Sequence, residues 1–439
     1  MKYNTLIEMR DDVGNAIREK DGTSGLIPVQ NFGDRIRAIP QSGGGWTRPK
    51  ERPAVKEDSD VNNNEIYMLF GVENGAPNDM AFNITALGGY AVDWGDGTVE
   101  NYSSGVTSAH QFNYATLAAA PDSNGVKWVY IKFIAANANE PMLGIVDVTH
   151  NVRPSWRPAA AATALYFPQV HEIYAKLPQL ATWTFATTHY TRLSNVEIVR
   201  LYGTNGITNL SYFMTYGSSL RQLRMDCSKC TNFTNFLNAC SVYNEPVEIN
   251  KPSGSAAFAG FMTNCYGFNS PITINCPAAQ DVNLSGFLSG CAAFNSELQI
   301  NVASLNTLAS FMNACAAYAG EVDLSAIGPG TNHVSFANGC VKIRSIKLDA
   351  GVVTSPPNTL SGLASLRKLR LLNMNAVTTT LNITGTSLLA AAIEQVFNDL
   401  YDRTGITAGT ITITNVFGAA ALTSAQRLIA TSKNWNIVG

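Results

Sequence analysis

Residues 247–250 read Val-Glu-Ile-Asn, residues 272–275 read Ile-Thr-Ile-Asn and residues 298–301 read Leu-Gln-Ile-Asn. In each segment two apolar residues stand two positions apart, so they would share one face of a β-strand. Such pairs recur along the chain at steps of 23 to 26 residues. A strand that returns at this spacing predicts a solenoid, in which each repeat packs against its neighbours.

The second apolar residue of each pair defines the predicted repeat core. Its members are Ile173, Ile198, Leu223, Ile249, Ile274, Ile300, Leu324, Leu348 and Leu371. We expect them to lie at the centres of about nine strands in a single right-handed parallel stack within residues 151–385. A polar residue follows the pair in five consecutive repeats, and we expect it to bond to the backbone of the next loop. These residues are Asn250, Asn275, Asn301, Ser325 and Asp349.

A second recurring pattern, of phenylalanine and cysteine, supports the predicted repeat. A phenylalanine precedes a cysteine by four residues in five repeats, which is the spacing of one helical turn. The phenylalanines are Phe236, Phe261, Phe287, Phe311 and Phe336, and the cysteine ladder is Cys240, Cys265, Cys291, Cys315 and Cys340. Each repeat is therefore predicted to contain a strand, a loop and a short helix or helical turn. We expect the cysteines to be buried and reduced, because they recur with the repeat as small core residues would.

Two further patterns accompany the ladder. Cys227 and Cys230 have the gap of half a zinc site, but no second pair of ligands follows, so zinc is not expected. An aromatic residue stands three positions beyond four ladder cysteines, at Tyr243, Phe268, Phe294 and Tyr318. These rings would either pack in the core or form an exposed ridge suited to sugar or protein contact.

The repeat spacing and the Phe-x-x-x-Cys pattern resemble the BspA-type leucine-rich repeats of bacterial and phage surface proteins. The resemblance covers residues 160–385. It implies a leucine-rich-repeat-type solenoid.

Residues 63–150 alternate short β-patterned runs with turn clusters, which predicts a small β-sandwich. Residues 90–98, Tyr-Ala-Val-Asp-Trp-Gly-Asp-Gly-Thr, resemble the signature of PKD-like (polycystic-kidney-disease-type) domains, although Phe112 stands where that family usually has tyrosine. Asp93 and Asp96 are a calcium candidate, since oxygen-rich turns can hold this ion. Alternatively, both carboxylates cap the turn by accepting backbone N–H groups.

Both ends of the chain differ from the repeats. Residues 1–42 are predicted to be a helical anchor whose apolar positions have helical spacing, and residues 43–62, with three glycines and then prolines, a linker. The anchor positions are Leu6, Met9, Val13, Ile17, Phe32 and Ile36. Residues 386–439 are predicted to be an α/β cap that shields the last repeat, with a helix beginning at Ser387.

Composition limits the classes of function. Charged residues make up 14% of the chain and the net charge is -2, so binding to nucleic acid is not expected. No apolar stretch is long enough for membrane insertion, and the N-terminus lacks the apolar core of a secretory signal, so we expect synthesis in a cytoplasm.

Nothing in the sequence predicts catalysis. The histidines are dispersed and no nucleophile or phosphate-loop motif accompanies them, so we expect neither an enzyme nor a cofactor. They are His110, His150, His171, His189 and His333. Basic residues cluster near the strand segments and form either a solvated face or a stripe that could contact an anionic polysaccharide. They are Arg221, Arg224, Lys229, Lys342, Arg344, Lys347, Arg367, Lys368 and Arg370.

Residues 12–32 resemble a segment found at the start of tailed-bacteriophage virion proteins. Together with the other two resemblances, this implies a structural virion protein of a tail fibre, baseplate or other tail or neck appendage, made in the host bacterial cytoplasm. It implies partners among other virion proteins at the N-terminus, a host-surface polysaccharide or protein at the solenoid, and a homo-oligomer. The alternatives are a bacterial surface adhesion protein of the same repeat family and a polysaccharide depolymerase.

Overall fold

The computed structural model describes residues 46–76, 78–137, 142–146, 169–180, 194–203, 206–251, 256–325, 332, 334–350 and 360–439. The chain divides into two units, Met1–Pro49 and Lys50–Gly439, and the fold given below is that of the second. The six predicted anchor positions, from Leu6 to Ile36, lie outside the described residues. The second unit is mainly β, as the sequence predicts.

The first part of this unit is two antiparallel sheets. Its strands are β1 (Glu65–Val72), β2 (Asp79–Ala86), β3 (Tyr90–Asp93), β4 (Val99–Tyr102), β5 (Thr107–Gln111), β6 (Lys127–Ala135) and β7 (Met142–Val146). One sheet contains the order β1-β6-β3-β4 and the other has the order β5-β2-β7. Phe70 of β1 stacks on Phe112, which follows β5, at 5.0 Å between ring centroids. This contact joins the inner faces of the two sheets, as in a β-sandwich.

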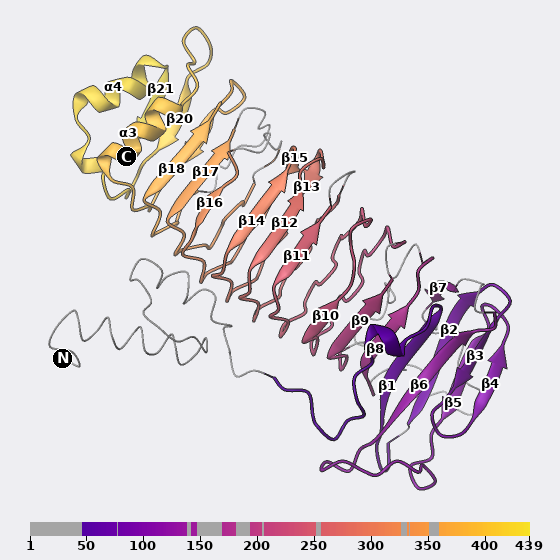
Figure 1. Ribbon diagram of the computed structural model, residues 1–439. Helices are drawn as coiled ribbons and strands as arrows, with labels where there is room; N and C mark the ends of the chain where they lie inside the picture. The colour runs from indigo at the N-terminus through magenta and orange to yellow at the C-terminus, as the bar shows by residue number, and fades with distance from the viewer. Residues whose placement is uncertain are drawn as a thin grey trace, which may run out of the picture. The chain divides into compact units, whose positions relative to one another are not determined.

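Parallel strands follow, side by side in the order of the sequence (Figure 1). They are β8 (Val170–Lys176), β9 (Ile198–Tyr202), β10 (Gln222–Arg224), β11 (Val247–Asn250), β12 (Ile272–Cys276), β14 (Leu298–Val302), β16 (Glu321–Asp323), β17 (Ser345–Asp349) and β18 (Lys368–Leu372). Ile249 pairs with Ile274, and Ile274 with Ile300. The prediction of a β-solenoid of about nine turns is confirmed. Eight of the predicted core positions lie within these strands, and Leu324 directly follows β16.

The coils form one stack, but their strands do not form one uninterrupted ladder. β11-β12-β14 and β16-β17-β18 are separate sheets of three, and β8, β9 and β10 belong to the sheet of β1. At the first break the backbone N–H of Leu223 donates to a carboxylate oxygen of Glu245 at 3.3 Å. The carboxylate of Glu245 therefore accepts a hydrogen bond that a backbone carbonyl of the neighbouring strand accepts elsewhere in the solenoid.

The predicted core position in β9 is wrong by one residue. Ile173 pairs with Val199, and Val199 with Leu223, whereas Ile198 pairs with Glu172 on the opposite face. Ile198 and Val199 are both buried. Both faces of the sheet are covered at this point, so the sequence shows an apolar run without the alternation that would fix the register.

The segment that carries the Phe-x-x-x-Cys pattern is not a helical turn. Leu237 donates its N–H to the carbonyl of Phe261 in the next coil at 2.9 Å, and its neighbours two positions away on either side bond in the same way. Asn235 and Ala239 have φ values of 54° and 61°, whereas an α-helix has negative φ throughout. The segment is a chain of turns in which every second N–H reaches the next coil. The two-stranded pair β13 (Val282–Asn283) and β15 (Leu305–Thr307) precedes two of these turn chains.

The sandwich and the solenoid share a sheet. β8 pairs antiparallel with β1 and parallel with β9, so the order across this sheet is β10-β9-β8-β1-β6-β3-β4. The division expected near residue 150 therefore does not separate two sheets.

The segment before β1 lies on this shared sheet. Residues 50–60, called the strap below, include the short 3-10 helix η2 (Asp58–Asp60) and bond to β6, β8 and β9. This corrects the prediction of a linker over residues 43–62, because its second half is held by side-chain contacts.

The C-terminal unit continues the stack with helices. It comprises β19 (Thr380–Asn382), α3 (Ala390–Asp399), β20 (Gly409–Thr412), the 3-10 helix η4 (Ala419–Ala421), α4 (Ser424–Ser432) and β21 (Trp435–Val438). Leu381, Ile411 and Ile437 are in parallel register. The predicted helix is present as α3, although it begins three residues after Ser387. No helix in the described part of the chain is long and apolar enough to cross a membrane.

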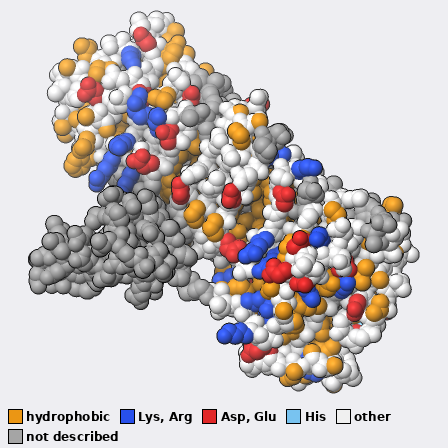
Figure 2. Space-filling model, in the orientation of Figure 1, with side chains coloured by type: hydrophobic (Ala, Val, Ile, Leu, Met, Phe, Trp, Pro, Cys, Tyr) orange, Lys and Arg blue, Asp and Glu red, His pale blue; other side chains and the backbone are white. Residues whose placement is uncertain are grey.

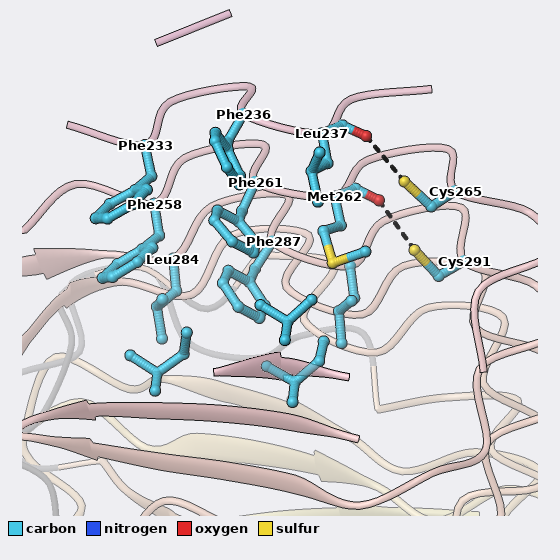
Figure 3. Close-up of a cluster of buried hydrophobic side chains, with 14 of the residues drawn as sticks. Phe233, Phe236, Leu237, Phe258, Phe261, Met262, Cys265, Leu284, Phe287 and Cys291 are labelled. Atoms are coloured by element: carbon cyan, nitrogen blue, oxygen red, sulfur yellow. Dashed lines mark hydrogen bonds between the residues drawn. The ribbon is translucent and has the colours of Figure 1, made fainter. Parts of the chain in front are cut away.

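Columns of rings fill the solenoid between strands and turn chains (Figure 3). One column consists of Phe213, Phe236, Phe261, Phe287, Phe311 and Phe336, whose successive centroids are 5.2 to 5.8 Å apart. All six side chains are buried. Each of the four inner rings stacks on the coil before it and on the coil after it, so each contributes to two interfaces between repeats.

Replacing Phe261 by alanine tests the importance of this column. We expect a loss of about 3–5 kcal/mol in the free energy of unfolding, because a fully buried ring between two others leaves a cavity. Urea unfolding followed by far-UV circular dichroism measures it. Tyr266→Ala, at a side chain that is 57% exposed in the same coil, should cost less than about 0.5 kcal/mol. Equal losses in the two variants would contradict the stacking argument.

Candidate binding surfaces

The two carboxylates of the calcium candidate cap the turn that follows β3. Asp93 Oδ1 accepts the N–H of Gly95 at 2.9 Å, and Asp96 Oδ1 accepts the N–H of Thr98 at 3.0 Å. Gly95 has a φ of +76°, and a Cβ there would lie 2.5 Å from the carbonyl oxygen of Tyr130, so only glycine fits. Of the two possibilities, the geometry matches the turn caps.

His110 holds the remaining oxygen of Asp96. Its Nε2 lies 2.7 Å from Asp96 Oδ2, and its ring stacks on Trp94 at 4.8 Å. Burial raises the pKa of Asp96, but hydrogen bonds from Thr98 and His110 outweigh this effect, so the pKa lies below its ordinary value. Trp94, Asp96 and His110 thus form a hydrogen-bonded and stacked group at the turn after β3, and this group is called the polar lock.

His171, the other described histidine, contacts Glu197 of the solenoid and Arg52 of the strap. His150, His189 and His333 lie outside the described residues.

The paired cysteines are core thiols. Cys230 is buried, Cys227 is half-buried, and both are free. Cys230 Sγ contacts the carbonyl oxygens of Thr208 and Asn232, and burial raises its pKa to about 11. Among the residues that the structure describes, no group of three or more His, Cys, Asp and Glu side chains is placed to hold a metal ion.

The cysteine ladder is buried, as expected, its thiols are free, and it forms bonds that the sequence did not indicate. Cys265 Sγ donates to the carbonyl of Leu237 and Cys291 Sγ to the carbonyl of Met262, each at 3.0 Å across to the previous coil (Figure 3). Cys240, Cys315 and Cys340 bond in the same way. Burial raises the pKa of the Cys240 thiol to about 12, so this thiol keeps the proton that makes its bond.

The four aromatic residues beyond the ladder are core residues. Tyr243, Phe268, Phe294 and Tyr318 stack in order at 6.3, 5.8 and 5.5 Å and are no more than 3% exposed. They cannot form an exposed ridge, so the structure favours the core alternative.

The outer face of β11, β12 and β14 carries an amide ladder. Asn275 Nδ2 donates to Asn250 Oδ1 at 3.3 Å, and Asn301 Nδ2 donates to Asn275 Oδ1 at 2.8 Å. The prediction that these asparagines bond to the following loop is wrong, because their amides bond to one another. In the other two repeats, Ser325 bonds to Asp323 and Asp349 to Asn373. Along β11, β12 and β14, one uncharged amide per coil thus faces solvent.

The structure contains a second asparagine ladder, which the sequence analysis does not predict. Asn244 Oδ1 accepts the N–H of Asn269, Asn269 Oδ1 accepts that of Asn295, and Asn295 Oδ1 accepts that of Ala319. Its sequence signal is an asparagine four residues beyond three successive ladder cysteines.

Several basic residues of the predicted stripe are paired with acids. Lys347 lies 3.3 Å from Asp323, Lys368 lies 4.0 Å from Glu321, and Arg370 lies 2.8 Å from Asp399. Figure 2 shows basic and acidic side chains intermixed over this part of the molecule. The surface is therefore a mixed one, which has less attraction for a polyanion than a basic stripe would have.

Comparisons of the chain with protein-family models, with curated proteins and with solved structures found no match.

Replacing Asp96 by asparagine tests the polar lock. The folded-state pKa is lowered, so the carboxylate contributes stability above its unfolded pKa of about 4, and this contribution disappears as pH falls through the folded pKa. We expect Asp96→Asn to lower the free energy of unfolding by about 1 kcal/mol at pH 7, with the difference closing below about pH 4. Thermal melts across pH measure it.

Asp281→Asn, at an exposed carboxylate, is the control and should change little. Millimolar calcium should leave the melting temperature of the intact protein unchanged, because three of the four carboxylate oxygens are already bonded. A calcium-induced rise in the melting temperature that Asp96→Asn abolishes would instead support a calcium site at this turn.

Cys291 tests the thiol ladder. A serine there would cost roughly 1–3 kcal/mol if its hydroxyl found no partner. The Met262 carbonyl offers a partner, so we expect a loss of only about 1 kcal/mol for Cys291→Ser and a larger one for Cys291→Ala. Urea unfolding measures both, with Ala292→Ser as an exposed control. Reductant should not change the stability of the intact protein, and a large loss on reduction alone would show cross-linking.

Proposed function

We propose that this chain is a structural component of a bacteriophage virion, in a tail fibre or another tail or neck appendage. The observation that carries the proposal is the repetition of one packing unit along the solenoid, with the phenylalanine column, the aromatic column and the thiol ladder continuous through it. Such an interior builds a stiff spacer and presents the same outer groups at regular intervals.

The N-terminal segment anchors the chain to other virion proteins in this proposal. Its support is the resemblance of residues 12–32 to the start of virion proteins. The sandwich is PKD-like, on the strength of the Asp-Trp-Gly-Asp-Gly turn, and the repeats are of the BspA-type leucine-rich class. The chain acts as a homo-oligomer, as attachment appendages gain strength by multivalent contact.

The solenoid contributes to attachment through its polar face. Amide groups at coil spacing can donate to and accept from the hydroxyl groups of a polysaccharide, and the amide ladder offers them without strong charge. A host-surface polysaccharide is therefore the preferred ligand and a surface protein the second choice.

A depolymerase remains a weaker candidate because it needs clustered free carboxylates on one face. Five carboxylates beside the solenoid strands are each bonded to an amide or a lysine: Glu248, Glu297, Glu321, Asp323 and Asp349. A bacterial adhesion protein would share the same architecture. The two candidates are therefore distinguished by where the chain is found, on phage particles or on the bacterial surface.

Immunogold electron microscopy tests the proposal. Antibodies raised against the full chain are applied to particles and to cells of the bacterium that carries the gene. We expect gold at one position on the tail or neck. A chain that starts near Trp46, supplied in place of the full chain, should be produced in folded form but be absent from particles, because its anchor is removed.

Gold confined to the surface of bacteria, with unlabelled particles, would favour the adhesion protein. Normal incorporation of the shortened chain would place the anchor elsewhere.

A further inference from the structure

The strap crosses the outer face of the shared sheet where the sandwich meets the solenoid. Arg52 lies over the ring of Trp128 on β6 at 4.6 Å, and its guanidinium bonds to Glu172 of β8 at 3.3 Å and to Glu197 before β9 at 2.7 Å. Its side chain is 5% exposed. One strap cation therefore neutralises two carboxylates of the solenoid while packing on the sandwich.

The middle of the strap repeats this arrangement. Lys56 Nζ lies 5.1 Å from the ring centre of Tyr67 and 4.9 Å from that of Tyr130. Tyr130 donates its hydroxyl to the carbonyl of Ala54, and Tyr202 of β9 donates to the carbonyl of Lys56. Strands β6, β1 and β9 are thus joined through one short segment.

The end of the strap is held by two ion pairs of opposite polarity to the first. Glu57 lies 2.7 Å from Arg200 on β9, and Asp58 lies 2.9 Å from Lys176 on β8. Along the strap the charges of Arg52, Lys56, Glu57 and Asp58 therefore match the partners beneath them. This match fixes one position for the strap on the sheet.

The contacts are those of a docked segment. No residue from 50 to 60 belongs to a strand, and Arg52 is the one buried side chain among residues 51–60. The ion pairs of Glu57 and Asp58 have carboxylates that are 56% and 63% exposed, so they weaken as salt is added. The buried pairs of Arg52 are screened less, and the ring columns of the solenoid do not depend on charge. The strap can therefore leave the sheet under conditions that leave the fold intact.

We propose that the strap is a reversible ionic latch. When closed, it clamps sandwich strands β6 and β1 to solenoid strands β8 and β9. When open, it uncovers the face lined by Trp128, Tyr130, Glu172 and Arg200. This device is independent of the proposed place on a virion.

Tryptic cleavage of the full chain after Lys56 tests the latch. The bond enters the protease only when the strap is open, so its cleavage rate follows the open population. The reference is a synthetic peptide of residues 50–61 under the same conditions. Relative to this peptide, we expect cleavage to accelerate by about tenfold or more when salt rises from about 0.05 M to about 1 M, where the screening length falls to about 3 Å.

Two variants leave the strap sequence unchanged. Lys176→Gln removes the partner of Asp58 and should raise the low-salt rate by about threefold, within the range of a partly exposed ion pair. Arg200→Gln removes the more buried partner of Glu57 and should raise it further while reducing the effect of salt. Lys347→Gln, which breaks an exposed pair in the solenoid, is the matched control and should leave the rate unchanged.

Three results would overturn the latch. Cleavage of the wild type at low salt as fast as the peptide would mean that the strap is not docked. A slow rate that neither salt nor both variants change would make the strap a permanent part of the fold. Cleavage after Lys368, within β18, at the same rate as after Lys56 would show that the whole unit opens.

Discussion

The structure depends on a requirement that each coil satisfies its backbone hydrogen bonds on the next coil. A strand supplies one set, as between Ile274 and Ile300, and the turn chain supplies another, as between Leu237 and Phe261. Turn chains bring non-glycine residues such as Asn235 and Ala239 into positive φ, which costs roughly 1–2 kcal/mol for each residue. The phenylalanine rings that these turn chains carry offset that cost, because each inner ring of the column is packed against a ring on both sides.

The same requirement explains the composition. Neighbouring coils place like residues next to one another, so a charge at a repeated position would face its own kind at about 4.8 Å. Asparagine avoids this, since an amide donates on one side and accepts on the other, as Asn275 does between Asn250 and Asn301. Thiols behave similarly inside, where Cys291 bonds to a carbonyl of the previous coil. A charged fraction of 14% suits such a ladder.

The two ends of the stack are closed differently. At the start, β8 pairs with β1 of the sandwich, so the first coil has a strand on each side and its outer face is covered by the strap. At the finish, α3 buries Ile393, Val396 and Phe397 and parallel strands continue to β21. A solenoid exposes apolar surface at each end unless another element covers it, and here the covering elements come from opposite ends of the second unit.

The sequence by itself determined the period of the repeat, the pairing of Ile249 with Ile274 and Ile300, and the burial of the cysteines. It could do so because each of these follows from a spacing within or between adjacent repeats. The tertiary structure alone decided that Val199 rather than Ile198 continues the core, that Phe-x-x-x-Cys is a chain of turns and that the strap is docked. Four-residue spacing fits a helix and a turn chain equally well, and a run that is buried on both faces has no alternation. Arg52 and Glu172 are 120 positions apart, and no local pattern records a partner at that distance.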